Sequence, residues 1–238
     1  VIFSEFLHVL LGEDSHLLFH EEQVESQVAM TTEKLVLDEK RTALIVVDML
    51  NSFLDDRGSI AQLGLPVAYL KPTLPPVKHL AERFRSAGMP VIFTRNNLQS
   101  DYSDAGRLAD RRQGAKEAQH SVGGTWGVQI HSELDLQPSD YVIDKTRPSA
   151  FYNTNIEGIL RGRHIETVVV CGVTTEICVE STVRDAFFRD YWVVVVKDAV
   201  AALDPMRHEG SLRTIEFGFG RLATTDEVVA ALPTALAV

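Results

Sequence analysis

Short, nearly continuous apolar runs alternate with helical patterns along most of the chain, and this alternation restricts the fold more than any other feature. An apolar run of roughly four to eight residues is typical of a strand that is covered on both faces. Strands and helices that alternate with short links predict an α/β fold, in which right-handed crossovers join parallel strands. The six predicted strands are residues 42–48, 90–95, 141–145, 167–173, 192–199 and a short one that begins at 221.

Helical patterns lie between these runs. In residues 72–88 the apolar side chains fall on one face, and Gly88 is placed to end the helix. Residues 96–140 show weak periodicity and many charges, so we expect loops and short helices near a site. Phe187 is expected to pack in the core. The other predicted helices cover residues 153–166, 176–190, 206–219 and 226–232, and Thr225 is expected to cap the last of them.

The charge balance of the chain is acidic. The 238 residues carry 23 basic and 33 acidic side chains, which gives a formal net charge of −10. We expect no nucleic-acid partner, because phosphate contacts need clustered Lys and Arg. With no internal repeat or low-complexity linker, the sequence predicts one domain over residues 30–238.

Residues 1–29 are predicted to be an N-terminal extension, because Met30 is followed by the polar "TTEK" and then by the first strand. The segment begins with apolar residues, but it lacks a basic region and is interrupted by Glu5, His8 and Glu13. We therefore expect neither a signal peptide nor a membrane helix, and no membrane partner. The alternative is an amphipathic helix that packs on the domain or on a partner.

The chain contains two cysteines, which are too few for a disulfide scaffold. Cys171 lies in an apolar run and is expected to pack in the core, whereas Cys178 follows one loop later. This use of cysteine fits a reducing compartment better than secretion, so the sequence favours a cytoplasmic location.

Three chemically active side chains follow or end predicted strands. Asp48 ends the first strand, Lys145 ends the third, and Cys178 opens the helix after the fourth. In parallel sheets the carboxyl ends of the strands meet at one edge, where ligands bind. An acid, a lysine and a thiol at that edge can form a thiol hydrolase, in which the cysteine attacks a carbonyl and a nearby base takes its proton.

The position of Cys178 supports this interpretation. If Thr174 or Thr175 caps the helix, Cys178 lies in its first turn, where unpaired N–H groups lower a thiol pKa and can hold an oxyanion. Each residue taken singly also has a simpler explanation. Cys178 could be a core residue between apolar neighbours, Asp48 a cap, and Lys145 an ordinary surface lysine. The joint occurrence of all three favours catalysis.

Three segments carry a resemblance to a known family. "TALIVVDMLNSF", "VIDKTRPSAFYNTNIEGILR" and "VVVCGVTTEICVESTVRDAFFRDYWVVVVKDA" resemble the isochorismatase-like cysteine hydrolases, over most of residues 42–232. The most specific part is the G-V-x-T-x-x-C-V pattern at residues 172–179. The resemblance implies a three-layer α/β/α sandwich with a mostly parallel, six-stranded, Rossmann-like sheet, assembled as a homodimer or homotetramer.

The resemblance also implies roles for the site residues. Asp48 would be the base, Lys145 its electrostatic partner and Cys178 the nucleophile. A cis peptide between Val173 and Thr174 would turn the Thr174 N–H toward an oxyanion, beside the N–H of Cys178.

Members of this family differ in substrate. The nicotinamidases hold a metal with an Asp-x-His motif after the second strand, but here "TRNNLQSDYSDAG" contains no histidine, so we expect no metal and no cofactor. True isochorismatases cleave a vinyl ether and can lack the cysteine. The segments "FYNTNIEGILR" and "CVESTVRDAFFRDY" are most similar to ureidoacrylate amidohydrolases, followed by biuret hydrolases and N-carbamoylsarcosine amidases.

These similarities predict an amidohydrolase that cleaves a C–N bond of a small amide or ureide through a thioester acyl-enzyme. The alternatives are an isochorismatase-type hydrolase of a non-amide metabolite and a nicotinamidase-like amidase without a metal. A redox or dinucleotide-binding protein is not supported, because no G-x-G-x-x-G loop follows the first strand.

The substrate-binding residues are harder to identify. Asn96 follows the second strand, Trp126 lies in "GGTWGVQI", and Phe151 with Tyr152 follows the lysine strand. Each aromatic residue could equally be a packing residue. A substrate carboxylate would require an arginine. The arginine candidates are Arg95, Arg107, Arg111 and Arg112, and His208 and Glu209 are weaker candidates for the site.

Overall fold

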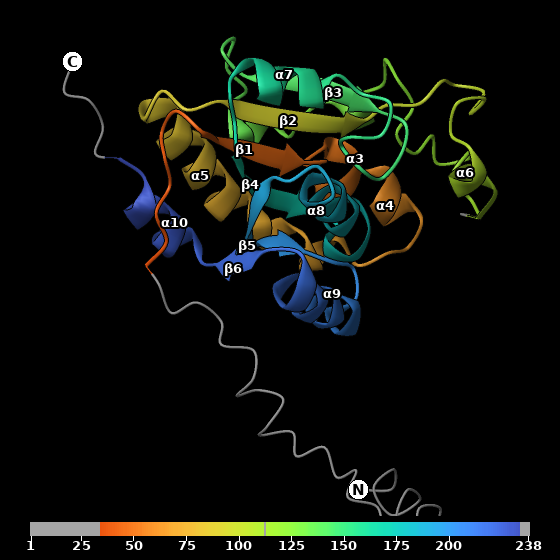
Figure 1. Ribbon diagram of the computed structural model, residues 1–238. Coiled ribbons are helices and arrows are strands. Elements are labelled where there is room, and N and C mark those ends of the chain that lie inside the picture. The colour runs from red at the N-terminus through yellow and green to blue at the C-terminus, as the bar shows by residue number, and fades with distance from the viewer. Residues whose placement is uncertain (1–33, 112, 234–238) are drawn as a thin grey trace, which may run out of the picture. The chain divides into compact units, whose positions relative to one another are not determined.

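All six residues of β1 (Thr42–Val47) are buried, as expected for an apolar run that is covered on both faces. The computed structural model describes residues 34–111 and 113–233. Within these residues six strands form one sheet, all parallel, in the order β3-β2-β1-β4-β5-β6 (Figure 1). The other strands are β2 (Val91–Asn96), β3 (Tyr141–Lys145), β4 (Thr167–Val173), β5 (Trp192–Ala201) and β6 (Arg221–Ala223).

Helices cover both faces of the sheet (Figure 1). Alternate residues of β1 enter two separate hydrophobic clusters, with Leu44 and Val46 in one and Ile45 and Val47 in the other. The first cluster includes α5 (Leu74–Ser86) and α10 (Thr225–Ala231). The second includes α7 (Ile156–Gly162), α8 (Glu180–Phe187) and α9 (Pro205–Gly218). The predicted three-layer α/β/α fold is therefore confirmed.

Short helical segments lie near the carboxyl ends of the strands. The arrowheads of β1 and β2 point toward the side of the sheet where α3 and α4 lie (Figure 1). The short α-helices are α3 (Asn51–Leu54), α4 (Ser59–Gln62) and α6 (Arg107–Arg111). Single turns are formed by Val67–Tyr69, Lys71–Thr73, Trp126–Val128 and Ser132–Leu134, and a π-helical turn by Thr175–Val179.

Two local predictions are corrected by the structure. Thr224, not Thr225, caps α10, because its hydroxyl accepts a hydrogen bond from the Glu227 N–H while the Glu227 carboxylate accepts one from the Thr224 N–H. Phe187 is 46% exposed and does not pack in the core. It lies at the carboxyl end of α8, where its ring contacts Phe188 and Phe219.

The winding direction of the sheet reverses beside β1. The chain runs from β1 outward to β3 on one side, then returns and continues from β4 to β6 on the other. The carboxyl ends of β1 and β4 therefore flank the point where the winding direction reverses, which is where open α/β sheets bind ligands.

Gly172 lets these two strands approach closely at that point. Its φ is +112°, and a Cβ added there would lie 2.1 Å from the carbonyl oxygen of Val47. The close approach therefore requires glycine.

Contacts group the described residues from Leu35 onward as one compact unit. The extension predicted for residues 1–29 lies outside the described residues. None of the helices in residues 34–111 and 113–233 has the length and apolar character to cross a bilayer.

Candidate active site

Asp48 is the first residue after β1, and its side chain is fully buried. Its φ of +49° is a left-handed conformation that Asp adopts more readily than most residues. Thr94 of β2 fixes this carboxylate. The Thr94 hydroxyl donates to Asp48 Oδ1 at 3.2 Å and accepts from the Asp48 N–H at 3.3 Å. Sequence reasoning did not identify Thr94.

Lys145 ends β3, and its side chain is fully shielded from solvent. Its Nζ lies 2.7 Å from Asp48 Oδ2 and 3.2 Å from the carbonyl oxygen of Arg147. Burial, the largest single effect, lowers the pKa of Lys145. The charges of Asp48 and Cys178 and the hydrogen bonds to both side chains outweigh it, so the pKa lies above its usual value. Lys145 is therefore a cation held between the acid and the thiol.

Cys178 lies in the π-helical turn between β4 and α8 and is 6% exposed. Thr182, one turn later in the chain, holds its backbone. The Thr182 hydroxyl donates to the Cys178 carbonyl at 2.7 Å and accepts from the Ala150 N–H at 3.0 Å. The loop that follows β3 is thereby connected to the backbone of the thiol residue.

The backbone before Cys178 has an unusual conformation. The peptide bond between Val173 and Thr174 is cis. The Thr174 carbonyl accepts hydrogen bonds from the N–H groups of Ile177 at 3.3 Å and Val179 at 3.1 Å. The second bond spans five residues and defines the π-helical turn. Cys178 therefore lies in the first turn after Thr174, although no side-chain cap is formed.

Cys171 has a different environment. It is fully buried among the side chains that face α5, and its thiol lies 3.8 Å from the carbonyl oxygen of Ile45. Burial raises the pKa of this thiol. Cys171 is a packing residue, as the sequence predicted, and neither cysteine forms a disulfide.

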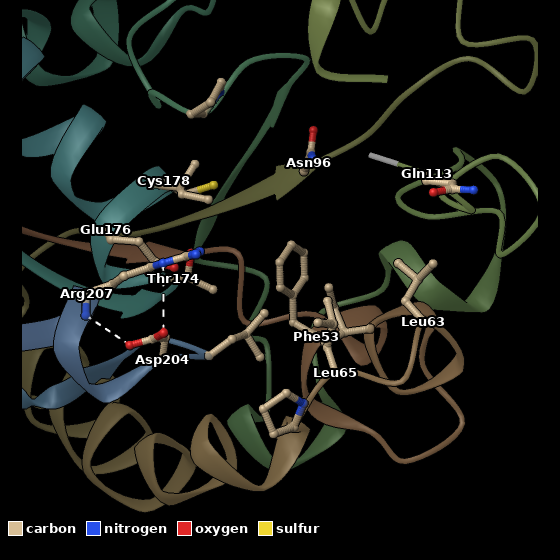
Figure 2. Close-up of a pocket in the computed structure, with 15 residues that line it drawn as sticks. Phe53, Leu63, Leu65, Asn96, Gln113, Thr174, Glu176, Cys178, Asp204 and Arg207 are labelled. Atoms are coloured by element: carbon tan, nitrogen blue, oxygen red, sulfur yellow. Dashed lines mark hydrogen bonds and ion pairs between the residues drawn. The ribbon is translucent and has the colours of Figure 1, made fainter. Parts of the chain in front are cut away.

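A cavity of about 490 Å³ opens in front of Cys178 (Figure 2). One wall is apolar and comes largely from α3, α4 and the segment after them. The other wall is polar and includes Thr174, Glu176 and the start of α9. Glu176 Oε2 and Asn96 Oδ1 are buried without a hydrogen-bond partner among the described residues. The lining residues are Phe53, Ile60, Leu63, Leu65, Pro66, Asn96, Gln113, Pro148, Thr174, Glu176, Ile177, Cys178, Leu203, Asp204 and Arg207.

Of the four residues predicted to bind substrate, Asn96 lines this cavity. Trp126 is 40% exposed, with the Arg57 guanidinium 4.5 Å from its ring centroid. Phe151 is a core residue whose ring packs on Tyr191, and Tyr152 is half-exposed. The three aromatic residues do not line the cavity, and their role in binding stays a prediction.

The arginines proposed for a carboxylate also lie elsewhere. Arg95 pairs with Asp144 through two hydrogen bonds of 2.6 and 3.0 Å. Arg107 and Arg111 do not line the cavity, and Arg112 lies outside the described residues. Arg207 does line it, but sequence reasoning missed this residue. Its position just after the fifth strand, at the carboxyl edge of the sheet, was the available signal.

The two weaker candidates do not line the cavity. His208 hydrogen-bonds through Nδ1 to the Thr175 hydroxyl at 2.9 Å, and burial lowers its pKa. Glu209 pairs with Arg213. In the part of the chain that the structure describes, no group of three or more His, Cys, Asp or Glu side chains is arranged to hold a metal ion.

Comparisons with known proteins identify the family that the chain resembles in sequence and fold. The chain matches the isochorismatase domain over residues 42–227. It is 34% identical over 216 residues to the ureidoacrylate amidohydrolase RutB of Rhizobium rhizogenes, covering 85% of this chain and 88% of that protein.

Solved structures show the same fold. A cysteine hydrolase from Pseudomonas syringae pv. phaseolicola superposes with a TM-score of 0.75 at 32% identity, covering 86% of this chain and all of that one. The N-carbamoylsarcosine amidase of Thermoplasma acidophilum gives a TM-score of 0.66 at 32% identity, covering 78% and 97%. The predicted family is confirmed, and the predicted enzyme class, an amidohydrolase, agrees with the names of these relatives. The chain belongs to the isochorismatase family.

Proposed function

We propose that this chain is a cysteine-dependent amidohydrolase that cleaves a C–N bond of a small amide or ureide, with Cys178 as the nucleophile. The observation that carries the proposal is that Cys178 lines the cavity, interacts with the buried Lys145, and is linked through it to Asp48, to which Lys145 donates a hydrogen bond. The amidohydrolase and amidase relatives support the class of reaction.

The first half of the reaction forms a thioester. Asp48 accepts the thiol proton, and the sulfur attacks the substrate carbonyl carbon. The N–H groups of Thr174 and Cys178 hold the oxyanion of the tetrahedral intermediate, each contributing roughly 3 kcal/mol to its stabilisation. The C–N bond then breaks, and ammonia or an amine leaves with the proton that Asp48 returns.

The second half releases the product. Asp48, again ionised, takes a proton from a water molecule as that water attacks the thioester carbonyl. The second tetrahedral intermediate collapses, the C–S bond breaks, and the thiol recovers its proton from Asp48. The product is an acid, or a carbamate when the substrate is a ureide. Throughout, Lys145 keeps its charge, which favours both the carboxylate and the thiolate.

The buried amide of Asn96 supports a ureide as substrate. The residue lines the cavity, and its Oδ1 is buried without a hydrogen-bond partner among the described residues. A substrate N–H group would satisfy this acceptor, because buried polar groups are hydrogen-bonded in stable complexes. Ureidoacrylate-like and biuret-like molecules both carry such N–H groups beside the reacting carbonyl.

The test is ammonia release from a panel of ureidoacrylate, biuret, N-carbamoylsarcosine, nicotinamide and maleamate. We expect Cys178→Ser to lower turnover of the preferred ureide about a thousand-fold or more while leaving the fold intact. Iodoacetamide should label Cys178 stoichiometrically and inactivate the protein. Cys171→Ala is the control, since it leaves the nucleophile in place. Full activity of Cys178→Ser would disprove the mechanism.

We also propose that residues 30–238 form the hydrolase domain, with residues 1–29 as an extension. The assembly is a homodimer or homotetramer, as the family resemblance implies. Cytoplasmic location is inferred from the use of cysteine. The net charge of −10 argues against nucleic acid as a partner. Sedimentation velocity of the full chain tests the assembly, and a monomer at micromolar concentration would contradict it.

A further inference from the structure

Among the described residues that line the cavity, Arg207 is the only one with a basic side chain. It belongs to the first turns of α9, and Figure 2 shows its side chain extending from that helix along the wall that Thr174 and Glu176 also line. Arg207 and Cys178 therefore line the same cavity, with the Arg207 side chain 69% exposed at its solvent side. The positive charge of Arg207 in the cavity therefore contrasts with the chain as a whole, whose net charge is −10.

The guanidinium of Arg207 is also available to a ligand. Its nearest ion-pair partner is Asp204, whose Oδ2 lies 3.9 Å from Nε, too far for a hydrogen bond. The Asp204 carboxylate is used instead as the helix cap, where Oδ1 accepts from the N–H groups of Met206 and Arg207. Arg95, in contrast, has its guanidinium occupied by the Asp144 carboxylate.

We propose that Arg207 is a specificity-determining residue that binds the anionic end of the substrate, so that the substrate class is a small ureide or amide that carries a carboxylate. This inference rests on the proposed function, because it concerns the same cavity. An arginine fork matches a carboxylate through two parallel hydrogen bonds. The apolar wall, which includes Phe53, Ile60 and Leu65, suits the short hydrocarbon segment between the carboxylate and the reacting carbonyl.

Glu176 provides the competing explanation for Arg207. Its Oε2 is buried in the same wall without a hydrogen-bond partner among the residues described. Arg207 could therefore serve only to offset the Glu176 charge. In the proposal, Glu176 instead accepts a hydrogen bond from a substrate N–H group, and the two side chains recognise different parts of one molecule. A double variant separates these explanations.

The experiment uses the full chain with Cys178→Ser, so that ligand binds without being consumed. Isothermal titration calorimetry compares 3-ureidoacrylate with its methyl ester, which differs in the carboxylate alone. We expect the acid to bind more tightly than the ester. Adding Arg207→Gln should weaken binding of the acid about ten-fold or more and change binding of the ester by less than about two-fold.

Arg213→Gln is the matched control, because Arg213 lies on the same helix, is exposed, pairs with Glu209 and does not line the cavity. It should leave both affinities unchanged. The proposal is overturned if Arg207→Gln leaves binding of the acid intact, if acid and ester bind equally well, or if neither binds. Glu176→Gln combined with Arg207→Gln should still bind the acid weakly. Recovery of parental affinity in this double variant would show that Arg207 merely offsets Glu176.

Turnover by the unmodified chain distinguishes this inference from the proposed function. If the acid binds through Arg207 but no ammonia is released, the amidohydrolase proposal fails and the inference stands. If acid and ester are hydrolysed equally by the wild type and by Arg207→Gln, the amidohydrolase proposal stands and the inference fails.

Discussion

Lys145 and Asp48 form an ion pair in which both side chains are fully shielded from water. Removing two charges from water is costly, and their attraction offsets that cost only when further hydrogen bonds complete the site. Thr94 supplies one such bond to Asp48, and the Arg147 carbonyl accepts one from Lys145. The pair is therefore a part of the fold as well as of the proposed chemistry.

Removing one member of the Lys145–Asp48 ion pair should destabilise the protein strongly. We expect Lys145→Met to lower the free energy of unfolding by about 3–5 kcal/mol, because Asp48 would remain as a buried, uncompensated charge. Urea denaturation followed by circular dichroism measures this change. Lys78→Met is the control, since Lys78 is half-exposed on α5 and pairs only weakly with Glu82. A loss below about 1 kcal/mol for Lys145→Met would match an ordinary surface pair and contradict the expectation.

The same pair predicts a pH dependence. The pKa of Lys145 is raised in the folded protein, so folding favours the protonated form. Its contribution to stability is fully present below the unfolded-state value of about 10.4 and is lost as the pH rises through the higher folded value. The difference in unfolding free energy between the wild type and Lys145→Met should not shrink between neutral pH and about pH 10, and it should shrink above that pH. A difference that shrinks between pH 6 and pH 9 would refute this assignment.

At the scale of secondary structure, Gly172 controls the spacing of β4 against β1 directly beside Asp48. A methyl group at this position would overlap the Val47 carbonyl, and the positive φ disfavours any other residue. We expect Gly172→Ala to lower the free energy of unfolding by at least about 1–3 kcal/mol. It should also lower turnover, because β4 carries the Cys178 turn.

Gly158→Ala is the matched control for this substitution. Gly158 lies within α7, and a Cβ there meets no atom within 4 Å. Within a helix, alanine is favoured over glycine by up to roughly 1 kcal/mol, so this variant should be at least as stable as the wild type. Urea denaturation and ammonia release from both variants provide the comparison. Unchanged turnover in Gly172→Ala would mean that the strand spacing does not position the thiol.

Sequence patterns predicted the strands well, because a short, continuous apolar run is buried most readily as a strand in a sheet that helices cover on both faces. They also placed Asp48, Lys145 and Cys178 at one edge, since parallel strands share their carboxyl ends. The patterns could not show that Thr94 would bond to Asp48, because side-chain direction across neighbouring strands depends on register. Nor could they show that Phe151 would pack against Tyr191, because an aromatic residue after a strand suits a pocket and a core equally.

The helix after β4 shows a further limit. A helical pattern over residues 176–190 predicted one regular helix, but the structure has a π-helical turn at Thr175–Val179 followed by α8. The apolar periodicity is nearly the same in both cases, so the pattern cannot distinguish them. Arg207 was missed for another reason: its side chain is 69% exposed, and its sequence context does not distinguish it from the arginines that are common on helix surfaces.

Considered as a whole, the described part of the domain has two large hydrophobic cores, one on each face of the sheet, and a small third cluster around Tyr102. The proposed catalytic residues come from strands on both sides of the reversal in strand order. Asp48 follows the central strand β1, and Cys178 follows its neighbour β4. Lys145, in contrast, lies on β3, which is bonded to β2 alone within the sheet.

The position of Lys145 on the edge strand has a consequence for heat tolerance. Edge segments open locally at lower free energy than the centre of a fold, and β3 has only five residues to resist fraying. When β3 frays, the ammonium leaves the acid while both cores stay intact. We expect activity to disappear during heating several degrees before the far-ultraviolet circular dichroism changes, whereas coincident curves would contradict this. The highest temperature at which the enzyme works is then set by the backbone hydrogen bonds that hold β3 to β2, and not by the unfolding of the hydrophobic cores.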